Sequence, residues 1–194
     1  MEKKRIAVLV SGGGTNLQAL IDATHSGVLQ SGELCLVVSN SSQAYALTRA
    51  ANAGILSAVL TGPDFEAQLE ALLEEHRIDL IILAGFMRIL SSAFTARYDR
   101  KILNIHPSLI PAFCGKGYYG LRVHEAALAR GVKVTGATVH FVNEIPDGGE
   151  ILLQKAVEVL PGDTPESLQR RVMEQAEWLL LPLAAELVSR GEIK

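Results

Sequence analysis

The chain has 194 residues, of which 48% are hydrophobic and 20% are charged, and its formal net charge is −3. That apolar content is enough for one sizeable buried core, so we expect a single domain over residues 1–194. The charge balance provides no global basic field that could hold long nucleic acid, and we therefore expect no nucleic-acid partner.

The cysteines and the N-terminal stretch favour a location in the cytoplasm. Cys35 and Cys114 are far apart in sequence and belong to no Cys/His cluster, which argues against a zinc site or a disulfide framework. The apolar stretch after the basic N-terminus breaks at the glycines of residues 12–14, too early for a signal peptide or a membrane span. We expect a cytoplasmic protein with no metal and no membrane partner.

The first part of the chain alternates between strand and helix patterns. A β-branched, apolar run predicts a strand over 6–10, glycines close it, and a helix follows from Asn16. Further strands are expected at 34–39 and 58–60, and further helices at 44–53 and 64–76.

The second part of the chain continues this alternation. Residues 80–84 and 102–105 are uniformly apolar, which is typical of strands buried on both faces of a parallel sheet. Later strands are expected at 132–142 and 151–159, followed by a long amphipathic closing helix over 165–189. The pattern predicts an open, mostly parallel, Rossmann-like α/β sheet with helices on both faces. Its ligands should bind beyond the carboxyl ends of the strands.

A glycine-rich loop, Ser-Gly-Gly-Gly-Thr-Asn at residues 11–16, joins the first strand to the first helix. Free N–H groups and the helix dipole at such a position favour an anion, and a phosphate is the natural ligand. The loop lacks the lysine of a nucleoside triphosphate loop, and Leu17 occupies the third glycine position of a dinucleotide fingerprint. A phosphate monoester is therefore favoured, and the alternative is a glycine turn that only lets strand and helix pack closely.

Two polar residues end the strand predicted at 102–105. Strand alternation points Asn104 and His106 to the same side, at the carboxyl edge of the sheet. An amide NH₂ and an imidazolium N–H can together donate hydrogen bonds to an oxyanion that forms during acyl transfer. The alternative is that His106 is a hydrogen-bonded structural histidine.

An acidic residue precedes two glycines at residues 147–149. Such a sequence is common in turns, and on the residues alone an ordinary Asx turn is the favoured interpretation of Asp147. If its carboxylate folds back beside His106, it should raise the pKa of that imidazole and keep the ring cationic near neutral pH.

Five sequence blocks cover nearly the whole chain in this order: SGGGTNLQALIDA, LAGFMRIL, NIHPSLIPAF, TGATVHFV and DGGEILLQ. Together they resemble the phosphoribosylglycinamide formyltransferase family, and the agreement of separate blocks is more specific than one short motif. The resemblance implies a formyltransferase domain that moves the formyl group of 10-formyltetrahydrofolate to the amine of 5′-phosphoribosylglycinamide (glycinamide ribonucleotide) in purine biosynthesis. Both implied partners are small molecules, and the oligomeric state is left open.

The resemblance also implies roles for single residues. Asn104 and His106 would stabilise the oxyanion on the formyl carbon, and Asp147 would pair with His106 and help to move protons from the attacking amine. The ribonucleotide would contact Gly14, Thr15, Asn16, Pro107 and Glu177. The folate, as co-substrate, would contact Met87, Arg88, Ile89, Leu90, Asn143, Glu144, Ile145 and Pro146.

Supporting roles are expected for other polar residues. Thr138 and His140 should lie behind the catalytic trio, whereas His124 is interpreted as structural. Arg88 either orients the pterin or the donor carbonyl, or it is a solvated loop arginine.

Two segments depart from the family pattern. Between Leu60 and Leu72 the family commonly has a longer segment with a basic residue near the ribonucleotide, whereas residues 61–66 of this chain contain none. The group that replaces this contact is left open. Residues 114–120 are rich in glycine and aromatics, and they form either a mobile flap over the folate or a packed surface loop.

Three alternatives share some of these features. A 10-formyltetrahydrofolate hydrolase or a methionyl-tRNA formyltransferase would have the same trio, but the first carries an extra N-terminal domain and the second a basic C-terminal one. We expect neither in a chain whose first strand begins at Ile6 and which ends at Lys194. A non-catalytic folate- or nucleotide-binding module would need no oxyanion donors, and the intact trio argues against it.

Overall fold

A computed structural model describes residues 2–193 and arranges their strands in one seven-stranded sheet. The strands are β1 (Lys4–Val10), β2 (Gly32–Ser39), β3 (Leu56–Val59), β4 (Leu80–Leu83), β5 (Ile102–His106), β6 (Val134–Phe141) and β7 (Ile151–Glu158). The helices are α1 (Thr15–Ser26), α2 (Tyr45–Asn52), α3 (Phe65–Glu75), α4 (Ser92–Arg97), α5 (Leu121–Arg130), α6 (Pro165–Val172) and α7 (Trp178–Ser189), with a π-helical turn η1 (Met173–Glu177) between the last two.

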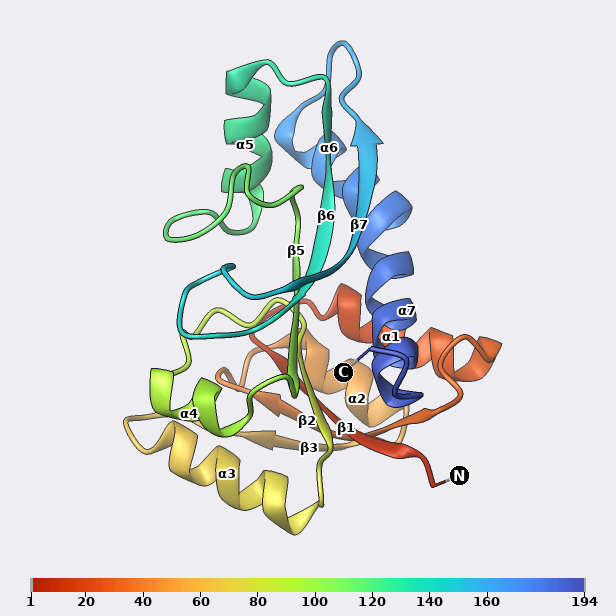
Figure 1. The fold of residues 1–194 in the computed structure, drawn as a ribbon, viewed down its shortest axis with the longest axis vertical. Coiled ribbons are helices and arrows are strands. Elements are labelled where there is room, and N and C mark those ends of the chain that lie inside the picture. The colour runs from red at the N-terminus through yellow and green to blue at the C-terminus, as the bar shows by residue number, and fades with distance from the viewer. Residues whose placement is uncertain (1, 194) are drawn as a thin grey trace.

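The strand order is β3-β2-β1-β4-β5-β6-β7. The first five strands pair in parallel, whereas β6 is antiparallel to β5 and β7 is antiparallel to β6. Figure 1 shows β6 and β7 extending with α5 and α6 away from the N-terminal part of the fold. The carboxyl ends of β1, β4 and β5 therefore meet at one edge of the sheet, which is where open α/β sheets bind their ligands.

Helices cover both faces of the sheet because successive strand residues are buried on opposite sides. In β1, Ile6, Val8 and Val10 belong to the core beneath α1, α2 and the C-terminal helices. Ala7 and Leu9 belong to the core beneath α3 and α4. None of these five side chains is exposed. The predicted open, mostly parallel α/β fold is confirmed.

The closing helix expected over 165–189 is not one continuous amphipathic helix. It divides into α6 and α7 at the π turn η1, and α7 contains Pro182, which cannot donate a helical hydrogen bond. The helix α7 also has apolar residues on both of its faces, since Leu180 is buried while Leu179 is 54% exposed. A π turn adds a residue to the helical turn and so changes the direction in which its last residue, Glu177, points.

The helices are short. The helix α4, which periodicity did not predict, has only six residues and begins where the hydroxyl of Ser91 accepts a hydrogen bond from the N–H of Phe94. The helices α1 and α7 have twelve residues each. Within residues 2–193 no helix has the length and apolar character needed to cross a membrane.

Candidate active site

A cavity of about 690 Å³ opens at the carboxyl ends of β1, β4 and β5. Its walls are the glycine loop at 12–16, the loop at 84–89, the end of β5, the segment 115–120, and the π turn. Asn104, His106 and Asp147 all line this cavity. The fold thus brings together three residues that are separated by up to 43 positions in sequence.

The carboxylate of Asp147 lies between the side chains of Asn104 and His106. Its Oδ2 is 3.4 Å from Nδ1 of His106, and its Oδ1 is 3.4 Å from Nδ2 of Asn104. The N–H of Gly115 donates a 2.8 Å hydrogen bond to the same Oδ2. Asp147 adopts a positive φ of 57°, which turns its side chain back toward β5.

The proximity of Asp147 to His106 is as expected, and its charge does raise the pKa of the ring, but the expected net increase is wrong. Burial lowers the pKa of His106 below its ordinary value, and the charge of Asp147 offsets only part of that effect. For Asp147, burial alone would raise the pKa. Contacts with His140, His106 and the N–H of Gly115 outweigh burial and keep the pKa below its usual value.

Both ring nitrogens of His106 are engaged. The carbonyl of Phe113 can only accept a hydrogen bond, so Nε2 of His106 donates to it at 2.9 Å. The other nitrogen faces Asp147. A substrate oxygen must therefore compete with one of these contacts. The partner groups Phe113 C=O and Gly115 N–H are backbone atoms, and no sequence signal could have identified them.

The glycine loop turns its carbonyls away from the cavity. The carbonyl of Gly12 accepts a hydrogen bond from the N–H of Ala46, and the carbonyl of Gly13 accepts one from Nε of Arg49. Gly14, with a φ of 71°, precedes α1, whose first-turn N–H groups have no helical acceptor. This arrangement can bind an anion at the start of α1.

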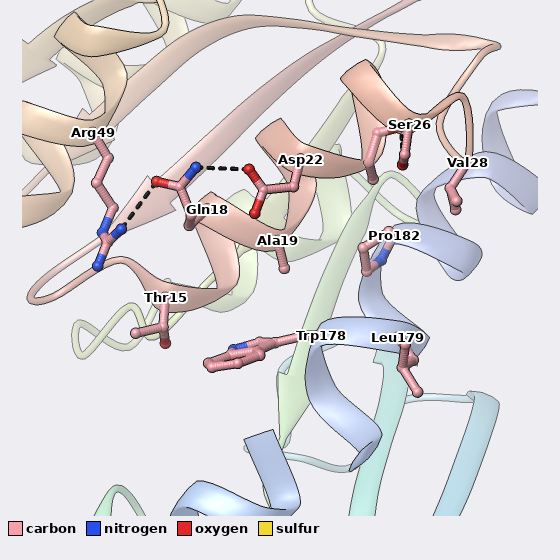
Figure 2. A pocket seen from close by; sticks show the side chains of 11 residues that line it. Thr15, Gln18, Ala19, Asp22, Ser26, Val28, Arg49, Trp178, Leu179 and Pro182 are labelled. Atoms are coloured by element: carbon pink, nitrogen blue, oxygen red, sulfur yellow. Dashed lines mark hydrogen bonds between the residues drawn. The ribbon is translucent and has the colours of Figure 1, made fainter. Parts of the chain in front are cut away.

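Arg49 was not identified from the sequence, because it looks like any exposed arginine of a short helix. Besides Gly13 it binds Oε1 of Gln18, whose amide donates to Asp22, so a polar chain runs along α1 (Figure 2). This chain borders a second cavity of about 430 Å³ between α1 and α7, with Trp178 in its wall (Figure 2).

Glu177 is a buried carboxyl at the end of the π turn, and it lines the same cavity as Asn104, His106 and Asp147. Nδ2 of Asn16 donates a 2.7 Å hydrogen bond to its Oε2. Burial raises the pKa of Glu177 to about 7, against the opposing effect of that hydrogen bond. The π turn and the glycine loop are thus joined by one buried contact.

The other residues assigned by resemblance are not all in the cavity wall. Those that line it are Gly14, Thr15, Asn16, Pro107, Met87, Arg88, Ile89 and Pro146. Leu90 is 8% exposed and belongs to the core beneath α3 and α4. Asn143 accepts a hydrogen bond from the N–H of Ile145 and so holds the turn that precedes Asp147, while Glu144 and Ile145 are exposed on it.

Arg88 lies against the segment that lacks a basic residue of its own. Its Nη1 donates a 3.0 Å hydrogen bond to the carbonyl of Gly62, and its guanidinium lies 4.7 Å from the ring centroid of Phe65. A cation from the loop after β4 therefore occupies this neighbourhood.

The segment 114–120 forms part of the cavity wall. Lys116, Tyr118 and Tyr119 line the cavity, and Gly115 and Gly117 adopt positive φ angles. The hydrogen bond from Gly115 to Asp147 connects this segment to the carboxylate beside Asn104 and His106. Within residues 2–193 no group of three metal-binding side chains is found.

An α/β sheet with a polar cluster and an anion-binding loop at its carboxyl edge is an architecture suited to group transfer. A model of the formyl transferase family matches residues 4–184. The chain therefore belongs to the formyl transferase family.

Similar proteins within this family have more specific names. The phosphoribosylglycinamide formyltransferase of Haemophilus influenzae is 44% identical over 98% of this chain and 90% of its own length. The trifunctional purine biosynthetic protein adenosine-3 of Homo sapiens is 45% identical, but the chain spans only 19% of that protein. The resemblance identified in the sequence is confirmed.

Two solved structures are also similar. Glycinamide ribonucleotide transformylase 1 from Symbiobacterium toebii has a TM-score of 0.88 and 42% identity, over 97% of this chain and 89% of that one. A formyltetrahydrofolate deformylase from Pseudomonas syringae has a TM-score of 0.89 at 26% identity, over 100% of this chain and 63% of that one. The fold alone thus does not determine the acceptor.

Proposed function

We propose that this chain is a cytoplasmic enzyme that transfers the formyl group of 10-formyltetrahydrofolate to the amine of 5′-phosphoribosylglycinamide, in purine biosynthesis. The products are N-formyl-5′-phosphoribosylglycinamide and tetrahydrofolate. The observation that carries the proposal is that the cluster of Asn104, His106 and Asp147 opens into the same cavity as the anion-binding glycine loop. Residues 1–194 act as one domain, and both partners are small molecules.

The chemistry is a direct attack without a covalent enzyme intermediate. The lone pair of the amine forms a C–N bond to the formyl carbon, and the carbonyl oxygen becomes an oxyanion. Asn104 and His106 stabilise that oxyanion by hydrogen bonds. The bond between the carbon and N10 then breaks, N10 receives a proton, and the attacking amine loses one. Asp147 assists this proton movement through His106, which its carboxylate contacts at 3.4 Å.

The walls of the cavity suggest where each substrate binds. The phosphate of the ribonucleotide binds the N–H groups of Gly14, Thr15 and Asn16 at the start of α1. Glu177 accepts hydrogen bonds from the sugar hydroxyls, and Pro107 contacts the same substrate. The folate occupies the part of the cavity bordered by Met87, Arg88, Ile89 and Pro146. Binding both substrates in one cavity favours attack by the amine over attack by water.

Hydrolysis of formyl-folate is the second candidate function, because the deformylase from Pseudomonas syringae has a similar fold. The anion-binding loop favours the transferase, since water needs no phosphate anchor. Formylation of a tRNA is disfavoured because a chain of net charge −3 provides no broad basic surface.

The test compares three acceptors at a matched concentration of 10-formyltetrahydrofolate. We expect folate consumption to depend on glycinamide ribonucleotide, with slow background hydrolysis and no formylation of methionyl-tRNA. Rapid consumption without any amine, unchanged when the ribonucleotide is added, would refute the transferase and favour the hydrolase.

A further inference from the structure

His140 lies directly opposite Asn104 in the sheet. The two residues are paired in the antiparallel ladder between β5 and β6. On its other side, β6 changes register with β7 between Val139 and His140. Such irregularities commonly redirect a side chain beside an active site. His140 is 1% exposed, so its ring nitrogens depend on protein partners.

The contacts of His140 determine which nitrogen carries the proton. Nδ1 lies 2.7 Å from the carbonyl oxygen of Phe141, and a carbonyl can only accept. In the neutral ring the proton is therefore on Nδ1, and Nε2 has a free lone pair. Nε2 lies 3.1 Å from Nδ2 of Asn104, within hydrogen-bond range. It lies 3.6 Å from Oδ1 of Asp147, beyond that range but near enough for a protonated ring to stabilise the carboxylate electrostatically.

This tautomer fixes the orientation of the Asn104 amide. An Nε2 lone pair attracts the NH₂ group and repels the amide oxygen, so Nδ2 of Asn104 points to the His140 side. The second N–H of the same Nδ2 faces Oδ1 of Asp147 at 3.4 Å, which is a long and weak contact. That N–H is the one that can turn to a developing oxyanion at little cost. If the amide flipped, it would present an oxygen instead.

We propose that His140 is a positioning residue, which acts as a hydrogen-bond acceptor through Nε2 and holds the Asn104 amide with its N–H toward the reacting carbonyl. The tautomer of His140 and the orientation of the Asn104 amide follow from contacts within this chain. The catalytic consequence rests on the proposed function, in which Asn104 is an oxyanion donor.

Two substitutions separate an acceptor role from a packing role. His140→Phe keeps the shape of the ring but removes the acceptor, whereas His140→Gln places an amide oxygen near the position of Nε2. We expect His140→Phe to lower kcat by about tenfold to a hundredfold, because loss of an oxyanion donor costs about a hundredfold. The KM of both substrates should change little, and His140→Gln should recover most of the kcat.

His124→Phe is the matched control, because it replaces another fully buried histidine by the same residue. It should leave kcat unchanged. If His140→Phe keeps the parent kcat, or if folded His140→Gln is as impaired as His140→Phe, the acceptor role is refuted.

A second measurement does not depend on activity. Long-range ¹H–¹⁵N spectra of the parent protein at neutral pH distinguish protonated from unprotonated imidazole nitrogens, and His140→Phe assigns the signals by their loss. We expect Nδ1 of His140 to be protonated and Nε2 to be unprotonated. A protonated Nε2 would overturn the inference. If the expected tautomer is found but the parent protein transfers no formyl group, the proposed function fails and the positioning of Asn104 stands.

Discussion

The two ends of the 690 Å³ cavity present different kinds of group. At the glycine loop the groups are backbone N–H donors, set by Gly13 and Gly14 and held by hydrogen bonds to α2. At the end of β5 they are the polar side chains of Asn104, His106 and Asp147, of which His106 and Asp147 can gain or lose a proton. Substitutions in the glycine loop should therefore act sterically and affect the binding of one substrate. Substitutions at the end of β5 should act on the rate of the chemical step.

The largest effect is expected at the β5 end. Asn104→Ala, His106→Ala and Asp147→Asn should each lower kcat by about a hundredfold or more, because each disturbs the stabilisation of the oxyanion or the movement of the proton. Steady-state kinetics with both substrates will measure this, and circular dichroism will check folding. A folded His106→Ala protein that turns over at the parent rate would refute the role of His106 in the chemical step.

The glycine loop should respond to a single methyl group. A Cβ on Gly13 would meet no protein atom within 4 Å and would point into space open to a ligand. Gly13→Ala should therefore raise the KM for the ribonucleotide by about tenfold or more, since a hydrogen bond to a charged group contributes roughly 1.5–3 kcal/mol. The KM for the folate, measured in the same assay, should stay near the parent value.

Gly14→Ala is the contrasting variant. Its Cβ would lie 2.6 Å from Cβ of Ala46, and the φ of Gly14 is 71°, so this change should lower the melting temperature. If Gly13→Ala instead lowers stability or raises both KM values equally, the loop is a packing element and not a phosphate site.

The difference between the two ends also explains what the sequence could predict. Uninterrupted apolar runs indicated β4 and β5, and their ends indicated Asn104 and His106. The glycines of residues 12–14 indicated the anion site. In each case the signal is local. Asp147 required the family resemblance, because its approach to His106 depends on the whole fold.

Features that depend on tertiary contacts could not be predicted. Arg49 contacts the carbonyl of Gly13 and leaves no pattern in its own segment. A supporting place for His140 was expected from the sequence, but its pairing with Asn104 and the register shift in β6 were not. The predicted direction of the net pKa shift at His106 was wrong. Burial of the ring outweighs the charge of Asp147, and the extent of that burial is set by the folded structure. The interruption of the closing helix at η1 likewise depends on packing.

Glu177 is an exception to this division, because it is an ionisable side chain at the glycine-loop end of the cavity. Burial raises its pKa from 4.5 to about 7. Between these values the folded protein keeps a proton that the unfolded chain has lost, so stability falls as pH rises through this window. Glu177→Gln should therefore become more stable relative to the parent from pH 4.5 to pH 7, by an amount on the order of 1.4 kcal/mol for each pKa unit.

Urea denaturation of both proteins at a series of pH values measures this difference. A constant stability difference across the series would mean that Glu177 is ionised at its ordinary pKa in the folded protein. The ribonucleotide KM, measured in parallel, should depend less strongly on pH in the variant if Glu177 contacts the sugar hydroxyls, and the remaining dependence should come from the titrating phosphate.

His124 provides a pH effect of opposite sign. Its side chain is fully buried in α5, and both ring nitrogens lack a hydrogen-bond partner among the described residues. Burial, with a smaller contribution from the charge of His106, lowers its pKa from 6.5 to about 4. In this range His124 binds a proton in the unfolded chain but not in the folded protein. The free energy of unfolding therefore decreases as pH falls from 6.5 toward 4.

His124→Phe removes this proton-binding difference, and the variant should lose less stability than the parent between pH 6.5 and pH 4, with little difference in slope above pH 7. Acid titrations followed by circular dichroism would show this as a lower midpoint of acid unfolding for the variant. Coincident midpoints would mean that the folded protein accommodates a charged His124. Opposite pH slopes for Glu177→Gln and His124→Phe would show that burial, which disfavours whichever form carries the charge, governs the ionisation of both side chains.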